Sequence, residues 1–333
     1  MLLYLSPMNR LIDRYSVLLV AIAATLWASD VYFRNQLVKH LSAPEIVVLE
    51  DALVALFLVP ALVRSFPEVR KLGLRGWIAV ILIAGGAQAI ATVLFTKSFS
   101  YGIYSETFVL YQTQPLIAIS LAWIVLGERR RAWFWPAVAV AVVAVYLVLQ
   151  APSITLQQPF APLSALQQGR LEAGLYALGA AALWAAGTVL GRYALGSVSF
   201  WSMTSLRFTL ALPVLLLLVL IPEGAAGFTH YQAQDVPNFL GIALIPGLLA
   251  LLLYYRALSK TPASLATIAE MAFPVAATLI AWGPPPIGFQ QPVYPAQIVG
   301  TVLLLGVILF LGWTKEKTPP VRQESAPLEL AAS

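Results

Sequence analysis

KSFSYGIYSETFVLYQTQPLIAISLAWIVLGERRRAWFWP, residues 97–136, carries a series of landmarks that recur 159 positions later, in residues 256–295. Upstream of this stretch, the matching positions are 157 apart instead. A single difference in loop length between two copies of one unit leaves such a change of offset, so the sequence predicts an internal duplication. The matching pairs are Lys97 and Arg256, Pro115 and Pro274, Ala122-Trp123 and Ala281-Trp282, Pro136 and Pro295, Trp27 and Trp184, and Leu49 and Leu206.

The composition predicts a membrane protein. Hydrophobic residues make up 60% of the chain and charged residues only 11%, with a mean hydropathy of +0.82. So little polar surface cannot cover a water-soluble globule. No cysteine is present, which excludes a disulfide framework and a thiolate metal site. The net charge of +5 is spread over short loops, so it suits a membrane surface and does not indicate a nucleic-acid partner.

Ten segments of the sequence are apolar and long enough to be membrane-spanning helices, which need about 20 residues each. The first is longer than the apolar region of a secretory signal peptide, so we expect it to be retained as a span. The ten segments fall five to each copy. They lie near residues 15–36, 44–63, 77–96, 103–126, 132–150, 172–194, 200–221, 237–257, 263–282 and 295–313.

Lysine and arginine separate between the two sides of this predicted topology, fifteen on one side against three on the other. Because cytoplasmic loops collect these residues, both termini are predicted to be cytoplasmic, in the plasma or inner membrane of the cell. Five spans in each copy make the second copy enter the membrane from the opposite side. The expected fold class is therefore all-α, with ten transmembrane helices arranged as two inverted-topology five-helix repeats, as in many secondary transporters.

The same pattern predicts the division of the chain. Residues 1–150 form the first repeat and residues 172–313 the second. Residues 151–171 between them are rich in Gln, Pro and Ser, which is typical of a linker, here on the outer side. Residues 314–333 are polar and contain prolines, so we expect a disordered cytoplasmic tail.

Several segments resemble a known family. LYQTQPLIAISLAWIVLGER (110–129), AALWAAGTVLGRYAL (181–195) and ALSKTPASLATIAEMAFPVAATLIAW (257–282) are similar to the paired EamA repeats of the drug/metabolite transporter superfamily. The resemblance covers nearly all of residues 15–313. It implies a ten-helix exporter of small metabolites, often amino acids or their relatives, with a central cavity formed mainly by the first four helices of each half. The family's Gly-Glu ends the fourth span as Gly127-Glu128, whereas the second copy reads GPPPIGFQQP (283–292) at that place.

Charged residues inside the spans are the first candidates for a functional site. Each costs about 2.5–3.5 kcal/mol on insertion scales, so each needs a reason to be there. Asp30 and Arg34 lie four residues apart on one helix face and can pair, with Trp27 one turn earlier. Alternatively, Arg34 extends to the outer surface and Asp30 only neutralises it. The intramembrane charged residues are Asp30, Arg34, Glu50, Asp51, Glu106, Arg207 and Glu270.

Glu50 and Arg207 occupy matching positions, so the two halves can present opposite charges to each other. This arrangement predicts either a structural ion pair between the repeats or a role with substrate or protons. Asp51 is turned about 100° from Glu50 on the same helix, so at most one of the two points squarely into a central cavity.

Glu270 and Tyr111 are also a matching pair, each about one turn before a proline. A proline within a span exposes a backbone carbonyl, and polar side chains beside it are candidates for substrate contact. Hydrogen bonds between helices are the alternative. The other residues of the predicted substrate site are Gln112, Gln114, Gln88 (on one face with Thr92), Trp184 and Thr188.

These features predict a secondary transporter that exports small polar or amphipathic metabolites by alternating access, without enzymatic activity. Five intramembrane carboxylates against two arginines favour a substrate that carries an ammonium group. Glu270 is the candidate for proton coupling, because burial favours the neutral acid and lets it exchange protons with each side in turn. Facilitated diffusion, with Glu270 binding the substrate amine, is the alternative.

Other classes of function fit the sequence less well. A membrane-embedded enzyme acting on a lipid or prenyl-linked substrate usually clusters its acids at one membrane edge, whereas these are spread over four helices. A non-transporting interaction protein would not need charges at membrane depth. No catalytic residue, cofactor or metal site is predicted, because His40 and His230 fall in separate outer loops and no HExxH or Walker motif occurs.

Overall fold

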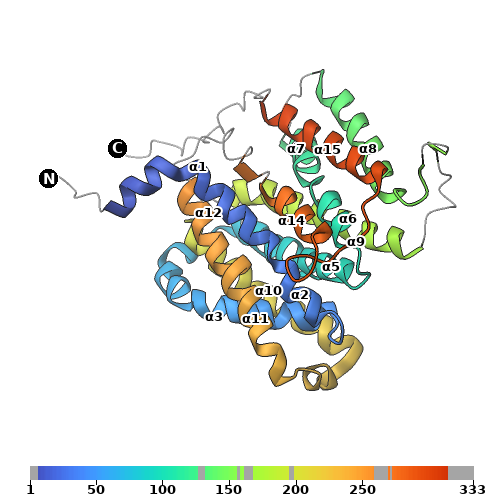
Figure 1. The fold of residues 1–333 in the computed structure, drawn as a ribbon. Coiled ribbons are helices and arrows are strands. Elements are labelled where there is room, and N and C mark those ends of the chain that lie inside the picture. Colours follow the sequence, from blue (N-terminus) through green and yellow to red (C-terminus); the bar gives the residue numbers. More distant parts are fainter. Residues whose placement is uncertain are drawn as a thin grey trace, which may run out of the picture.

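The computed structural model describes residues 7–126, 132–155, 158–160, 168–194, 199–258, 269–270 and 272–313. All regular elements in these residues are helical, with no strand among them (Figure 1). The prediction of an all-helical membrane protein is therefore confirmed. Within this part of the chain six segments are long and apolar enough to cross a membrane, namely Tyr15–Leu37, Ala43–Val69, Leu74–Phe99, Gln168–Leu190, Trp201–Thr229 and Ala233–Tyr254. Shorter apolar helices occupy Phe134–Leu149, Ala272–Trp282 and Pro295–Phe310.

Helices of the first half follow the predicted spans, and several spans are interrupted. The first span breaks at Ser29, and the third contains a π-helical turn, η1. The fourth breaks at residues 112–113. The elements are α1 (Pro7–Ala28), α2 (Asp30–Leu37), α3 (Ala43–Val69), α4 (Leu74–Leu82), η1 (Ile83–Ile90), α5 (Ala91–Phe99), α6 (Tyr104–Tyr111), α7 (Gln114–Leu126) and α8 (Phe134–Leu149).

In the second half, helix α9 begins at Gln168, earlier than the predicted start at residue 172. The first part of the predicted ninth span, the tail 314–333 and residues 127–131 lie outside the described residues. The elements are α9 (Gln168–Ala194), α10 (Phe200–Glu223), η3 (Gly224–Thr229), η4 (Ala233–Asp235), α11 (Val236–Ile242), η5 (Ala243–Leu249), α12 (Ala250–Leu258), α14 (Ala272–Trp282) and α15 (Pro295–Trp313).

The duplication is visible in the backbone. Helices α3 and α10 begin 157 positions apart, at Ala43 and Phe200. The segments 74–99 and 233–258 begin and end 159 positions apart, and each has a π-helical turn in its middle, η1 in one and η5 in the other. Because π-helical turns are rare, their recurrence at matching places supports two copies of one unit. The change of offset falls between α3 and α4 in the first half and between α10 and η4 in the second.

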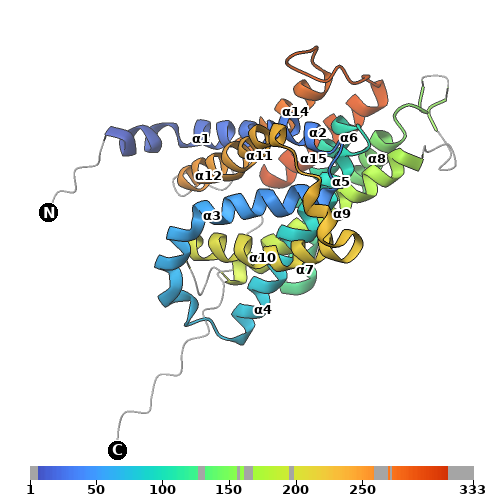
Figure 2. The ribbon, with the colours of Figure 1, turned by 90° about the horizontal axis from the view of Figure 1, so that it is seen from below.

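Helix packing has the same two-fold pattern. Helix α3 packs against its own counterpart α10, and α8 packs against its counterpart α15. Helix α1 packs against α12 and α14, and its counterpart α9 packs against α5 and α7. Figure 2 shows α3 beside α10 and α1 beside α12. Exchanging the halves leaves this set of contacts unchanged, as a pseudo-two-fold relation requires.

Small side chains allow the helices to approach closely. A Cβ added at Gly187 of α9 would lie 2.4 Å from the Cβ of Ala87 in η1. Large apolar side chains such as Leu56, Ile124 and Leu279 are about two-thirds exposed on the outside, at 65%, 67% and 65%. Close packing on small residues and an apolar outer surface are typical of membrane helices.

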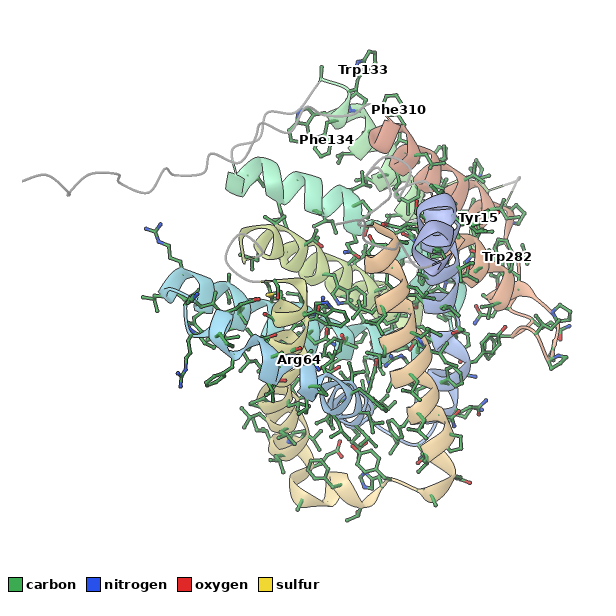
Figure 3. The ribbon with its side chains drawn as sticks, turned by 90° about the vertical axis from the view of Figure 1, so that its left-hand side faces the viewer. Tyr15, Arg64, Trp133, Phe134, Trp282 and Phe310 are labelled. Atoms are coloured by element: carbon green, nitrogen blue, oxygen red, sulfur yellow. The ribbon has the colours of Figure 1, made fainter. Side chains whose placement is uncertain are left out.

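Aromatic side chains gather where α8 begins and α15 approaches its end. Figure 3 shows Trp133, Phe134 and Phe310 near one another in this region. Trp133 is 65% exposed. An exposed tryptophan at the end of an apolar helix is typical of the aromatic belt at a membrane interface.

Candidate functional site

Arg34 lies at the centre of a buried ion cluster. Helix α2 begins at Asp30, directly after the break at Ser29, so Asp30 and Arg34 share one face of a short helix. Arg34 donates hydrogen bonds from Nε and Nη2 to the two carboxylate oxygens of Asp30, at 2.6 and 2.8 Å. It also donates to Glu50 Oε2 at 2.9 Å and to Thr96 Oγ1 at 2.6 Å. Because Arg34 is only 2% exposed, the alternative in which it extends to the surface is wrong.

Glu50 and Asp51 are both buried, and they face different helices. Glu50 pairs with Arg34 of the first span. Asp51 Oδ1 accepts a hydrogen bond from Gln88 Nε2 at 2.9 Å, and Gln88 Oε1 accepts one from Arg207 Nε at 2.6 Å. A polar connection between the halves is present as the chain Asp51–Gln88–Arg207, whereas Glu50, the residue matched with Arg207 in sequence, pairs with Arg34.

The π-helical turn η1 carries Gln88 at the junction of three helices. Its side-chain amide bridges α3, which holds Asp51, and α10, which holds Arg207. The second carboxylate oxygen of Asp51, Oδ2, is buried and has no hydrogen-bond partner among the described residues. A buried polar atom without a partner is costly, and in a membrane protein such an acid marks a functional position.

Aromatic side chains from both halves form a second cluster. Trp27 contacts Tyr254 with ring centroids 4.9 Å apart, and Trp184 contacts Phe95 at 5.2 Å. These two contacts are counterparts, because Trp27 matches Trp184 and Phe95 matches Tyr254 along the sequence. The cluster comprises Trp27, Phe95, Tyr111, Trp184, Tyr254 and Phe273.

Glu270 and Tyr111 contact different members of this aromatic cluster. The hydroxyl of Tyr254 donates to Glu270 Oε1 at 2.5 Å, which places the acid beside the Trp27–Tyr254 pair. Tyr111 instead packs edge-on against Trp184 at 5.1 Å and against Phe273 at 5.4 Å. The predicted pair of matching residues is therefore brought to one aromatic cluster, acidic on one side and aromatic on the other.

The predicted interruption of the fourth span is present. Helix α6 ends at Tyr111 and α7 begins at Gln114, one residue before Pro115. Gln112 is buried at the break and Gln114 is half-buried. Interrupted helices of this kind often border substrate sites in transporters, so a role for both glutamines stays a prediction.

Thr188 and Glu106 lie apart from these contacts. Thr188 is exposed, and its hydroxyl donates to the carbonyl oxygen of Trp184 in its own helix at 3.0 Å. Glu106 forms a buried ion pair with Arg170 at the start of α9, and Arg170 lies 5.7 Å from the ring centre of Tyr294. The Glu106 pair ties the fourth and sixth spans together and leaves Glu106 outside the two clusters.

Thr96, Phe95 and Tyr254 were missed by reasoning from the sequence. Thr96 lies four residues after Thr92 and eight after Gln88, so a polar stripe along one face of this span was a usable signal. Phe95 and Tyr254 differ by the repeat offset of 159, and comparison of the two copies could have selected them as a pair.

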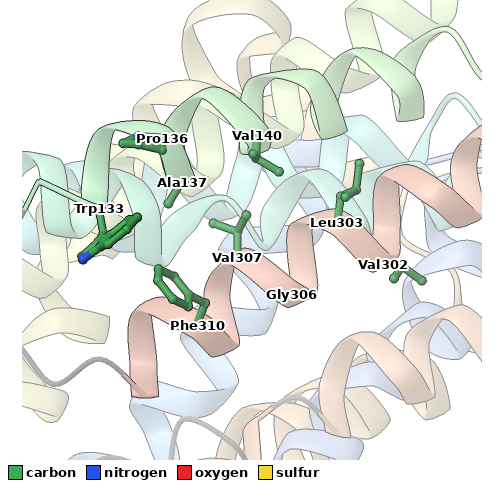
Figure 4. Close-up of a pocket in the computed structure, with 9 residues that line it drawn as sticks. All are labelled: Trp133, Pro136, Ala137, Val140, Val302, Leu303, Gly306, Val307 and Phe310. Carbon is green, nitrogen blue, oxygen red and sulfur yellow. The ribbon is translucent and has the colours of Figure 1, made fainter.

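A separate apolar groove lies between α8 and α15. Its volume is about 380 Å³, and all of its lining residues are apolar (Figure 4). Trp133 and Phe310 lie near each other at one end, and Val302 lies towards the other. Without polar groups, this groove fits lipid chains better than a polar substrate.

Comparison with known proteins identifies the protein family. The sequence pattern of the EamA-like transporter family matches residues 14–150 and 172–313. The chain belongs to the EamA-like transporter family. The riboflavin transporter ImpX of Fusobacterium nucleatum subsp. nucleatum is 28% identical to this EamA-like protein over 297 residues, which are 86% of this chain and 94% of that one. A crystal structure 14% identical in sequence shares the fold, with a TM-score of 0.55 over 90% of this chain and 97% of that chain.

Membership of the EamA-like transporter family makes this protein a multi-pass membrane transporter with two repeats. The family and the named relative also point to a transporter rather than an enzyme. The Asp51–Gln88–Arg207 chain and the aromatic cluster are the places where side chains described above join the two halves of this EamA-like transporter.

Proposed function

We propose that this EamA-like protein is a secondary transporter that exports a small amphipathic metabolite, with a planar ring, by alternating access between its two inverted halves. The observation that carries the proposal is the aromatic cluster, in which Trp27 and Trp184 come from counterpart helices and each contacts a ring of the other half. The family resemblance supports the proposed direction of transport, and the charge bias of the loops supports cytoplasmic termini in the plasma membrane.

A planar ring suits this cluster because aromatic pairs at 4.9–5.4 Å already provide faces and edges for stacking. Each such contact contributes about 0.5–1.5 kcal/mol beyond the burial of apolar area. Glu270 borders the cluster through its bond to Tyr254, and Gln112 and Gln114 follow Tyr111 at the break of the fourth span, so hydrogen-bonding groups are at hand. The riboflavin transporter among its relatives makes a flavin the first compound to test, since a flavin combines a planar ring system with a polar chain.

A zwitterionic or cationic amine, such as an amino acid, is the second candidate substrate. Asp30 and Glu50 already pair with Arg34, so they do not need a substrate cation. Asp51 and Glu270 form no ion pair with a side chain of the described residues, and an ammonium group would supply one. The fourth-span acid Glu106 is paired with Arg170 and does not enter this count.

Transport assays on purified protein reconstituted in proteoliposomes test the proposal. We expect saturable flux of radiolabelled riboflavin or of an amino acid, reduced by Trp184→Ala and unaffected by Thr188→Ala, whose hydroxyl only bonds to its own helix. Measurement in both directions, with an imposed pH gradient and without one, separates export from uptake and coupled transport from facilitated diffusion. Correctly folded protein that moves none of a panel of flavins, amino acids, polyamines and nucleosides would contradict it.

A further inference from the structure

Both histidines of the chain lie at one end of the helix bundle, each paired with a carboxylate across a long sequence separation. His40 Nε2 lies 3.1 Å from Asp235 Oδ2, and His230 Nδ1 lies 2.6 Å from Glu45 Oε1. The charge bias of the loops predicts that this end faces away from the cytoplasm. Only His230 has a second carboxylate nearby among the described residues, with Glu223 Oε2 at 3.7 Å.

Glu45 is held in a fixed orientation. It lies in the first turn of α3, where its Oε2 accepts a hydrogen bond from the backbone N–H of Ser42 at 2.5 Å. The hydroxyl of Tyr231 donates to the Glu45 carbonyl oxygen at 2.7 Å and fixes the neighbouring loop against α3. Burial raises the pKa of Tyr231, so this hydroxyl keeps its proton. Glu45 is 1% exposed, and its Oε1 is directed at His230.

Glu223 contributes a carboxylate oxygen that accepts no hydrogen bond. Its Oε2 is buried and has no hydrogen-bond partner among the described residues. A Cβ added at Gly227 would come within 3.0 Å of this oxygen, so the turn η3 closes over the carboxylate. A buried carboxylate oxygen without a hydrogen bond, facing an imidazole, is typical of a position completed by a cation.

We propose that Glu45, Glu223 and His230 form a binding site for a divalent transition-metal ion of the Zn²⁺ type. Their donor atoms all lie within 4.8 Å of one another. Ligands of a tetrahedral Zn²⁺ at 2.0–2.1 Å are about 3.3 Å apart, so the observed separations of 2.6 and 3.7 Å from His230 Nδ1 need to change by about 0.7 and 0.4 Å. The His230 side chain is 48% exposed, which leaves the fourth position open to water.

The ion would join the two halves. Glu45 belongs to the first half, whereas Glu223 and His230 belong to the second half, at the place where its connection is longer than the counterpart between α3 and α4. A transporter that alternates must separate its halves at each end in turn. A bound ion therefore holds this end closed and slows transport, a consequence that rests on the proposed function.

Metal binding to the purified full-length protein tests the site without any assay of transport. After treatment with a chelator, we expect the protein to bind one Zn²⁺ in calorimetric titration and to show a higher unfolding temperature with ZnCl₂. Mg²⁺ should not compete, because an imidazole ligand favours Zn²⁺ over Mg²⁺. His230→Ala and Glu223→Gln should each weaken binding by about tenfold or more.

His40→Ala is the matched control, because it removes the other histidine of a histidine–carboxylate pair and leaves the three ligands intact. Its affinity for Zn²⁺ should equal that of the unmodified protein. Glu45→Gln also changes the side chain that accepts the bond from the Ser42 N–H at the start of α3, so the His230 and Glu223 variants carry the test if it fails to fold. Absence of Zn²⁺ binding, equal binding by His230→Ala, or an equal loss in His40→Ala would each overturn the proposal. In that event the three side chains form only the contacts seen in this structure, between His230 and the two carboxylates.

Discussion

The two halves place matching helices in matching positions, yet the side chains that they present at the centre differ. In the first half, Asp30 and Arg34 form a buried ion pair. Their counterparts 157 positions later are both glycine, Gly187 and Gly191. The two halves therefore share a backbone arrangement. At these matched positions the first half has charged side chains and the second half has glycines.

Packing explains why the second half lacks this pair. At Gly187, helix α9 approaches η1 so closely that an added Cβ would lie 2.4 Å from the Cβ of Ala87. A carboxylate has no room there. The break at Ser29 gives α2 its own direction and makes room for the ion cluster, whereas α9 is continuous through the matching position. Equal topology therefore does not imply equal chemistry.

Glu270→Gln is expected to have the largest effect, because it removes the titratable member of the Glu270 and Tyr111 pair. Transport driven by a pH gradient should be lost completely, while exchange of labelled for unlabelled substrate continues, since exchange needs no net movement of protons. Counterflow and gradient-driven uptake in the same proteoliposomes measure both.

Asp51→Asn is the comparison for Glu270→Gln, because Asp51 is the other intramembrane carboxylate of the described residues that forms no ion pair. If Glu270→Gln weakens exchange and binding together, and a pH gradient never concentrates substrate even in the unmodified protein, Glu270 binds the substrate and does not carry protons. If Asp51→Asn alone abolishes the coupling of transport to the pH gradient, the proton site lies in the first half.

Arg34→Met should lower the free energy of unfolding by about 3–5 kcal/mol, because it leaves two buried carboxylates without their cation. Arg207→Met should also lower the free energy of unfolding, by at least about 1.5 kcal/mol, because it removes the donor to the side-chain oxygen of Gln88. Denaturation of both variants in detergent measures the difference between the halves. Adding Asp30→Asn and Glu50→Gln to Arg34→Met should restore most of the loss, and a triple variant as unstable as Arg34→Met alone would argue against this account.

Gly187→Ala tests the close approach that excludes charge from the second half. The added methyl group meets Ala87 and should lower the free energy of unfolding by about 1–3 kcal/mol. Gly86→Ala is the control, because a Cβ there meets nothing within 4 Å. A Gly187→Ala protein as stable as the control would mean that the two helices can separate without cost.

Trp27→Leu and Trp184→Leu should have the smallest effects, each weakening substrate binding by about 3- to 10-fold through the loss of one stacking contact. Similar losses are expected, because the two tryptophans occupy counterpart positions in the aromatic cluster. Equilibrium binding of the transported compound measures them. A loss confined to one variant would show that the substrate lies in one half only.

Much of the fold could be predicted because apolar length and repeat offset depend on the sequence alone. The duplication, the helical segments and the break before Pro115 all follow from such patterns. The partners of the charged residues could not be predicted in this way. The break at Ser29 and the π-helical turn η1 change the direction of the side chains that follow, and a shift of one residue turns a helix face by about 100°. The hydropathy pattern contains no information on that rotation. The sequence therefore predicted Arg207 as the partner of Glu50, whereas the structure pairs Glu50 with Arg34.

The cluster of Glu45, Glu223 and His230 escaped prediction for another reason. His230 and Glu45 are 185 residues apart, and the loop that carries His230 has no counterpart of equal length in the first half. Only the packing of the loop against α3 brings them together.

The difference between Tyr111 and Glu270 also bears on why the two halves are joined in one polypeptide. A pair of identical five-helix chains would place the same residue at both members of every matched pair. Such a homodimer would have two tyrosines or two acids at this point, and two acids facing one aromatic cluster would repel each other when ionised. Within a single chain, one position can titrate while its counterpart stays aromatic. Joining the halves in one chain thus allows different residues at matched positions, which a symmetric assembly of identical half-length subunits does not allow.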